Sequence, residues 1–423
     1  MGLGLYLFAI ARDGAPISPV DLDRIGEEFL AAIPDESLRE FVSFSRDDER
    51  VYVALHPAEE NVELWFNDGK LWCSAKTSSC GPGYHAYLVD ILRRLADRMR
   101  LEWIIDEEQE SLDETGYWTN QDFEDMQTEM AWLFRAIAKP CSDDDKSRIM
   151  LSMSIGYPSV ANMKGFAMTS MGFRSLSWLR DIAASTDPPI HAAAGHFSWW
   201  NRGLDELFWK RYALVLCWTE LNWNVPQNDK ERRRYERVLT CFRRARACDP
   251  SVTLPEDEIA EIEQLLTEYA ECDETLASDT SRIGFLRHVV RRALPGQWSV
   301  AVPGWWHCDW EDDNTTFVCW GDRVTVRVSS FVYNAEPKKS PLEAVGKVPL
   351  AEDFLEVIDD RDANPPGWAT ISLASEEGDG YWKLSGEKGK TNGLAIVTIC
   401  FDEISDRDRA LETWRSLMYT GKD

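Results

Sequence analysis

The chain has 423 residues, 44% of them hydrophobic, and carries 73 acidic against 46 basic side chains, a formal net charge of −27. Because single hydrophobic cores stop growing beyond about 250–300 residues, this length predicts two or three domains. The charge repels nucleic-acid phosphates and anionic membrane surfaces, and it attracts basic partners. We therefore expect no binding to nucleic acid or to membranes. The simpler alternative is that the charge only provides solubility.

The cysteines and the start of the chain indicate a compartment. None of the ten cysteines forms a Cys-x-x-Cys pair, and Cys217, Cys319 and Cys400 lie in apolar runs. A cysteine in such a run behaves as a small buried hydrophobe, which fits a reducing compartment better than a disulfide framework. The first residues show no basic signal-peptide region, and no apolar run reaches the about 18 residues of a membrane span. We expect a soluble, cytoplasmic protein.

Residues 1–145 predict an α+β domain. Strand patterns occur at 4–11, 40–45 and 50–55, and Asp68-Gly69 is a hairpin turn between two more. A Gly-Pro-Gly turn then leads into a helix with apolar residues at helical spacing. Cys80 and His85 flank this turn. They could form a nucleophile pair or bind a metal, but with no orienting acid nearby in the sequence we expect structural roles.

Acidic residues are densest between Ile104 and Asp145. Within this block, residues 120–138 predict an amphipathic helix with its acids on the solvent side. The acids lack the regular spacing of a calcium loop, so we interpret them as a solvated face or a partner-binding face, and not as metal ligands. The residues that we expect to contact a partner are Asp106, Glu107, Glu108, Glu110, Asp113, Glu114, Asp143, Asp144 and Asp145.

Residues 146–293 predict a mainly helical domain that begins with two strand-like segments. The helix over 228–246 is basic, and the segment 256–263 that follows it is acidic. We expect these neighbours to pair their charges; nucleic-acid binding by the arginines is the alternative. The other helices are predicted near 175–185, over 197–223 and at about 279–293.

Residues 294–423 predict an antiparallel sheet with a closing helix, the whole chain then having an α+β fold. Ser405-Asp406-Arg407-Asp408 reads as a capping box that starts this helix. Near residue 307 the chain concentrates tryptophans, which form either a binding hot spot or part of the core. His307, Cys308 and Asp309 are consecutive, so on an extended segment they alternate faces and cannot all bind one ion.

The sequence contains none of the local motifs that identify a catalytic site. It has no nucleophile elbow, no His-Glu-x-x-His and no phosphate-binding loop. His191 and His196 are five residues apart, which misses the spacing of a helical zinc pair. We expect no enzymatic activity, no cofactor and no metal. An enzyme whose site is assembled from dispersed His, Cys and acidic residues stays open, because folding can bring such residues together.

Several segments carry a resemblance. The helix CGPGYHAYLVDILRRLA, the motif DETGYW before the acidic helix, and the C-terminal VPGWW and VRVSSF resemble uncharacterised bacterial proteins found near polymorphic or type VI secreted toxins, which look like immunity proteins. The C-terminal part is also similar to Mog1/PsbP-type α+β modules, which act in binding. This resemblance carries over no catalytic residue.

The resemblance implies a cytoplasmic immunity protein that binds and neutralises a cognate toxin. Toxins that act on nucleic acids are usually basic, so an acidic inhibitor gains association rate through steering and can mimic phosphate. The alternatives are the dispersed-site enzyme and a scaffold or adaptor that uses the helical middle. The sequence indicates neither the toxin's activity nor the oligomeric state.

Overall fold

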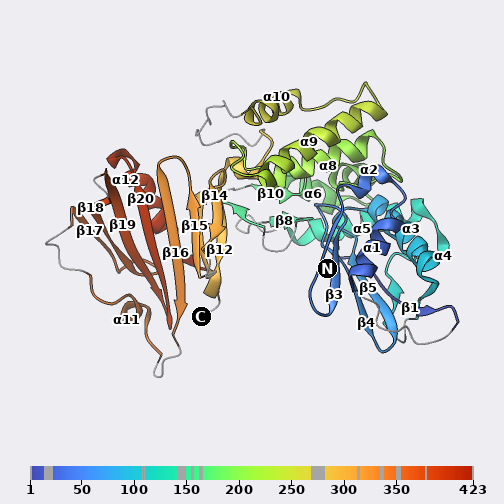
Figure 1. Ribbon diagram of the computed structural model, residues 1–423, viewed down its shortest axis with the longest axis horizontal. Coiled ribbons are helices and arrows are strands. Elements are labelled where there is room, and N and C mark those ends of the chain that lie inside the picture. Colours follow the sequence, from blue (N-terminus) through green and yellow to red (C-terminus); the bar gives the residue numbers. More distant parts are fainter. Residues whose placement is uncertain are drawn as a thin grey trace.

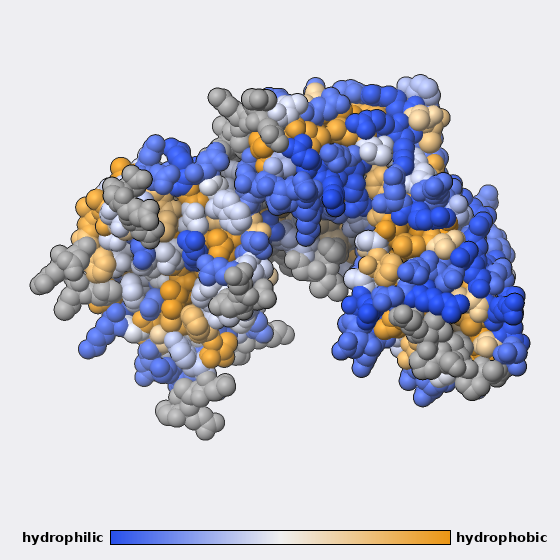
Figure 2. Space-filling model, viewed as in Figure 1, coloured by the Kyte–Doolittle hydropathy of each residue, from blue (hydrophilic) through white to orange (hydrophobic). Residues whose placement is uncertain are grey.

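The computed structural model describes residues 2–13, 22–106, 108, 110–141, 149–153, 157–161, 165–267, 282–311, 315–333, 338–348, 354–376 and 379–421. Helices and several antiparallel sheets alternate along the chain, so the predicted α+β fold is confirmed. Figure 1 shows a β-rich C-terminal lobe on one side and a larger lobe of sheet and helices on the other. Figure 2 shows a notch between these lobes on the same face.

The N-terminal sheet has the strand order β2-β3-β4-β5-β1-β6, and β7 pairs with the same edge of β1 as β6. Its inner face, which includes Leu5 and Leu7, packs against α1 (Leu22–Ala32) and α3 (Pro82–Met99). The strands are β1 (Gly4–Ala11), β2 (Ser43–Arg46), β3 (Arg50–Ala54), β4 (Val62–Asn67), β5 (Lys70–Lys76), β6 (Leu101–Ile104) and β7 (Leu112–Asp113).

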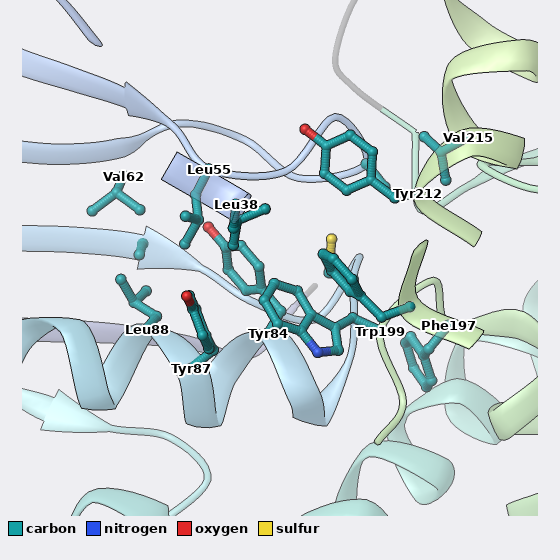
Figure 3. Close-up of a cluster of buried hydrophobic side chains, with 14 of the residues drawn as sticks. Leu38, Leu55, Val62, Tyr84, Tyr87, Leu88, Phe197, Trp199, Tyr212 and Val215 are labelled. Atoms are coloured by element: carbon teal, nitrogen blue, oxygen red, sulfur yellow. The ribbon is translucent and has the colours of Figure 1, made fainter. Parts of the chain in front are cut away.

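Helix α3 is the most deeply buried helix of this lobe, because the sheet covers one side and further helices cover the other. Proline at its first turn suits the fixed backbone angle of a helix start, and Arg100 ends it in the left-handed conformation. In Figure 3, Tyr84 and Leu88 of α3 lie in one apolar cluster with Leu38 and Tyr212. The sheet and the helices therefore share one core.

The helices of the middle follow a small sheet of β8 (Ile149–Leu151), β10 (Phe166–Thr169) and β11 (Gly172–Ser175). Side chains of Ser175, Asp205 and Asn228 accept backbone N–H groups at three helix starts, as N-caps do. The helices of this lobe are α2 (Glu36–Arg39), α4 (Tyr117–Asn120), α5 (Phe123–Cys141), α6 (Leu176–Ala184), α7 (Ile190–His196), α8 (Glu206–Thr219), α9 (Asp229–Cys248) and α10 (Glu256–Leu265).

The C-terminal lobe contains a sheet of order β14-β15-β16-β20-β19-β18-β17, closed by α12 (Arg407–Arg415) and flanked by α11 (Pro341–Val345). Trp414 of α12 is fully buried against this sheet, as the prediction of a closing helix requires. The strands are β14 (His307–Trp310), β15 (Thr316–Trp320), β16 (Val324–Val332), β17 (Glu356–Asp360), β18 (Gly367–Glu376), β19 (Asp379–Lys390) and β20 (Gly393–Phe401).

A second small sheet of order β21-β13-β12-β9 links the lobes. Its strands are β9 (Ser159–Val160), β12 (Val289–Leu294), β13 (Trp298–Pro303) and β21 (Met418–Tyr419). It corrects the prediction of a helix at about 279–293, since the described part of that range ends in a strand. The physical reason is that β12 satisfies its backbone groups by pairing with β13 and β9, which sequence periodicity does not reveal.

Two further sequence predictions are corrected locally. Within 197–223, only the residues of α8 are helical. The last helix is present, but the hydroxyl of Ser405 donates to Glu403 instead of capping it. Within the described residues, no helix has the length and apolar character needed to cross a lipid bilayer.

The predicted boundaries at residues 145 and 293 stay predictions. The apolar packing itself forms one large cluster with members from Leu5 to Leu265, a second with members from Leu294 to Leu417, and a small third one with members from Val160 to Val290. The acidic helix α5 belongs to the first cluster through Met126, Met130 and Phe134.

Candidate functional site

The outer face of the N-terminal sheet, opposite α1 and α3, carries a groove of about 670 Å³. It lies over β1, β4 and β5, where alternate side chains point away from the core because strand residues alternate between faces. The polar and aromatic side chains that line it include Tyr6, Arg50, Glu60, Glu63, Trp65, Lys76 and Glu114. The groove therefore combines charge with aromatic surface.

The charges in the groove are partly compensated. Arg50 pairs with Glu63 at 2.5 Å, and Lys76 pairs with Glu60 at 3.1 Å. Glu114 accepts the backbone N–H of Gly4 at 2.7 Å. Three carboxylates stand against two cations, which leaves the groove with an excess of negative charge. These side chains are substantially exposed, so a partner's cations can compete for the carboxylates at small cost.

An aromatic strip lies beside the groove on the same face. Phe8, Trp72 and Trp65 stand opposite one another on β1, β5 and β4, with ring centroids 5.2 Å and 6.1 Å apart. The ammonium of Lys70 lies 4.0 Å from the Phe8 ring centre, and the guanidinium of Arg50 lies 5.0 Å from that of Trp65. Aromatic rings and arginine are the residues that protein interfaces concentrate at their centres.

The structure places four of the predicted contact acids at the edge of this face. Strands β6 and β7 both pair with the same edge of β1. The segment that connects them contains Asp106, Glu108 and Glu110. Glu108 and Glu110 are exposed, and Asp106 accepts the backbone N–H of Glu108 at 3.1 Å. Glu114 follows within the groove itself. Glu107, Asp143, Asp144 and Asp145 lie outside the described residues.

Asp113 is not part of this exposed face, which corrects its place in the predicted contact set. Its side chain is 1% exposed, and it accepts hydrogen bonds from the Thr115 hydroxyl at 2.8 Å and the backbone N–H of Trp118 at 2.6 Å. His85 Nε2 lies 3.3 Å away. Burial raises the pKa of Asp113, but the hydrogen bonds from His85, Trp118 and Thr115 outweigh it and hold the pKa below its ordinary value.

His85 thus joins two of the segments on which the resemblance rests. Its Nδ1 lies 2.9 Å from the Thr77 hydroxyl before α3, and its Nε2 lies 3.1 Å from the hydroxyl of Thr115 in DETGYW. Asp113 is distant from His85 in the sequence and reaches it only through the pairing of β7 with β1. Since His85 is fully buried, this network holds α3 against the sheet and presents nothing to a substrate.

A second buried cluster brings a thiol and an imidazole together at the start of α3. Cys80 Sγ lies 3.0 Å from His56 Nδ1, and Glu59 accepts the backbone N–H groups of Ser79 and Cys80 at 2.8 Å and 3.0 Å. Burial lowers the pKa of His56 to about 3, and burial also raises the pKa of Glu59 to about 7.

This cluster has the residue types of a cysteine nucleophile but not its conditions. Burial, reinforced by Glu59, raises the pKa of the Cys80 thiol, whereas a catalytic cysteine needs a stabilised thiolate. Tyr84, Trp199 and Tyr212 surround the His56 ring and shield the pair from solvent. The predicted structural role of Cys80 therefore fits its surroundings, with the cluster fixing the turn that starts α3.

Several arginines of α9 are engaged within the chain. Arg246 pairs with Glu256 at the start of α10, as the predicted charge pairing expects. Arg244 instead pairs with Glu40, and Arg237 donates to the backbone carbonyl of Phe41 at 3.0 Å. Arginines of the basic helix α9 therefore fix the segment that follows α2 against the helix.

The tryptophan-rich segment of the C-terminal lobe is mostly core, since Trp305 and Trp306 are buried while Trp310 is partly exposed. His307 Nδ1 lies 3.3 Å from Glu231 of α9, so β14 contacts the helical lobe here. Across the described part of the chain, no cluster of three or more His, Cys, Asp or Glu residues could hold a metal ion.

Comparison with known proteins adds little. No protein-family model and no curated protein matches the chain. Among solved structures, a protein of Bacteroides thetaiotaomicron VPI-5482 is similar at 18% identity over 31% of this chain and 47% of that one, with a TM-score of 0.25. This chain thus spans less than half of that protein's length, and a likeness of this size carries no argument about fold or function.

Proposed function

We propose that this chain is a cytoplasmic immunity protein of a bacterium that binds a basic cognate toxin and neutralises it. The observation that carries the proposal is the outer face of the N-terminal sheet, where three carboxylates in a groove adjoin an aromatic strip. Aromatic rings and an arginine beside charged groups match the composition of protein–protein interfaces.

Charge supports the choice of a basic partner. The net charge of −27 draws a cationic protein towards the chain and raises its association rate. At close range, Glu60, Glu63 and Glu114 offer acceptors to lysine and arginine side chains of the partner. The exposed acids Glu108 and Glu110 extend this acceptor surface at the edge of β1.

Hydrophobic anchoring supports the same face. Tyr6 and Trp65 both line the groove, and Tyr6 is 48% exposed. Large aromatic side chains surrounded by polar groups commonly supply most of the binding energy of an interface. The thiol–imidazole pair of Cys80 and His56 is in contrast enclosed, which favours a binding role for the chain over a chemical one.

The test is co-expression of the chain with the protein encoded by the adjacent reading frame, with cell growth as readout, followed by binding kinetics of the two purified proteins. The informative variant replaces Glu60, Glu63 and Glu114 by glutamine. We expect association to slow about tenfold and its salt dependence to flatten, because steering and local pairing are both weakened. Trp65→Ala should instead raise the dissociation rate by about tenfold or more.

A matched control removes as many charges far from the groove. Glu311, Asp359 and Glu403 are exposed, ion-paired acids of the C-terminal lobe, and their replacement by amides changes the net charge equally. Equal slowing by both triple variants would place the binding face elsewhere. If the chain neither protects the cells nor binds the neighbouring protein, the immunity function itself is contradicted.

A further inference from the structure

Two cysteines stand directly opposite each other in the C-terminal lobe, Cys308 on β14 and Cys319 on β15. In this register the backbone N–H of Glu311 bonds to the carbonyl of Thr316, which makes that pair a hydrogen-bonded one. Because hydrogen-bonded and non-hydrogen-bonded pairs alternate along antiparallel strands, Cys308 and Cys319 form a non-hydrogen-bonded pair.

This position has the geometry that a disulfide requires. Opposite residues of a non-hydrogen-bonded pair have Cα atoms about 4.5 Å apart and side chains on the same face of the sheet. Disulfides join residues with Cα atoms about 4.4–6.8 Å apart. The two sulfurs can therefore be joined by side-chain rotation, without moving either strand.

The two thiols differ in access. Cys319 is fully buried, whereas Cys308 is partly exposed on β14, the edge strand of the sheet. In the reduced chain the Cys308 thiol donates a hydrogen bond to the carbonyl oxygen of Trp306 at 3.5 Å. A small reagent from solvent thus reaches Cys308 more readily than Cys319.

They also differ in acidity. The hydrogen bond that Cys319 donates to Cys308 lowers the pKa of the Cys308 thiol against the effect of burial, and the nearby guanidinium of Arg292 acts in the same direction. Donating that bond, together with burial, raises the pKa of Cys319. Cys308 is the better nucleophile of the pair, and Cys319 retains the proton.

We propose that Cys308 and Cys319 are a reversible redox modification site, in which a hydroperoxide converts the dithiol into a cross-strand disulfide. The Cys308 thiolate attacks a peroxide oxygen, the O–O bond breaks, and a sulfenic acid forms while the other oxygen leaves as an alcohol or water. The Cys319 sulfur then attacks the Cys308 sulfur, gives up its proton, and displaces water. In total, two thiols and one hydroperoxide give one disulfide, one alcohol and one water.

The site adjoins a contact between the lobes. His307, the neighbour of Cys308 on β14, lies against Glu231 of α9. A disulfide would link the edge strand β14, which makes this contact, covalently to the neighbouring strand β15. Reduction by a small dithiol through thiol–disulfide exchange would release it again.

The test treats the full-length, freshly reduced chain with an equimolar amount of hydrogen peroxide and maps the products by mass spectrometry. Cleavage at acidic residues between the cysteines, such as Asp309 and Glu311, separates the two peptides unless a disulfide links them. We expect this linked pair, separable by dithiothreitol, to form about tenfold faster than oxidation of the exposed Cys248.

Variants assign the two steps. Cys319→Ser should leave a sulfenic acid on Cys308 that dimedone traps, and Cys308→Ser should leave Cys319 unreacted. Cys400→Ser, on β20 of the same sheet, should not affect the cross-link. A trivalent arsenical, which bridges two close thiols, should protect both cysteines of the unaltered chain. Oxidation of Cys248 ahead of the pair, or oxidation of Cys308 beyond the sulfenic acid without a linked peptide, would overturn the proposal.

Discussion

The Nε2 atom of His85 lies 3.3 Å from a carboxylate oxygen of Asp113, and both side chains are shielded from solvent. This contact connects α3 with β7 and draws the two most distinctive segments of the chain into one buried network. Because Asp113 is buried in this contact, a partner cannot touch it. The network stabilises the sheet whose outer face forms the groove.

Replacing Asp113 by asparagine should therefore destabilise the fold. An amide accepts the hydrogen bonds of Thr115 and Trp118 less strongly than a charged carboxylate does. Its NH₂ group would also face groups that are themselves hydrogen-bond donors. We expect a loss of about 2–3 kcal/mol in the free energy of unfolding, measured by chemical denaturation followed through tryptophan fluorescence. Glu102→Gln, at an exposed site on β6, should change it by less than about 0.5 kcal/mol. Equal effects of the two variants would show that the buried network contributes no stability.

Gly83 is required by close packing at the first turn of α3. Its N–H donates to the carbonyl of Trp199 at 3.0 Å, and a Cβ there would lie 2.2 Å from the carbonyl oxygen of Asn201. Although alanine favours a helix by about 1 kcal/mol, we expect Gly83→Ala to cost about 2 kcal/mol net, because the clash is with backbone. Gly195 in α7 has open space around it, so Gly195→Ala should be neutral or stabilising by up to about 1 kcal/mol. The melting temperature should fall in Gly83→Ala and should stay the same or rise in Gly195→Ala.

Two buried histidines should make the fold acid-sensitive. Burial lowers the pKa of His56 and of His196 to about 3 each, from an ordinary value of 6.5. Between these values the unfolded chain binds protons that the folded chain does not, so stability falls as the pH drops below 6.5. Each histidine contributes a slope of up to about 1.4 kcal/mol per pH unit.

The measurement is the free energy of unfolding as a function of pH in His196→Gln. This variant should lose about one proton's worth of slope in that window, whatever its absolute stability. His191→Gln, at an exposed site on the same helix, provides the matched control and should keep the wild-type slope. An unchanged slope in His196→Gln would mean that His196 is not held neutral.

Glu59 should produce the opposite trend. Burial raises its pKa to about 7 from an ordinary 4.5, although the N–H groups of Cys80 and Ser79 oppose the shift. Between these pH values the folded chain binds the extra proton, so this contribution to stability is present at low pH and is lost as the pH rises towards 7. Glu59→Gln removes the titration and keeps an acceptor for the backbone. The stability of this variant relative to the wild type should rise by about 2–3 kcal/mol from pH 4.5 to pH 7.5, and a constant difference would contradict the assignment.

Of the proposed binding face, the sequence indicates one part. The dense acidic block points to Glu108, Glu110 and Glu114, which the structure places along one edge of the sheet. It does not indicate Glu60 and Glu63, because acids outside the dense block are common in a chain with 73 of them. The groove forms only when β1, β4 and β5 pair, and that pairing brings residues from distant parts of the sequence onto one face.

The sequence by itself determined most of the local elements, including the hairpin at Asp68-Gly69, the helix after Pro82 and the alternating strands of the C-terminal sheet. These elements depend on hydrophobic periodicity and on turn residues, which can be read from residues close together in the sequence. Only the tertiary structure decided that 289–294 is a strand, that Asp113 is buried, and that Cys308 faces Cys319. Each of these depends on strand register or on hydrogen bonds between segments far apart in the chain, and a local pattern does not contain that information.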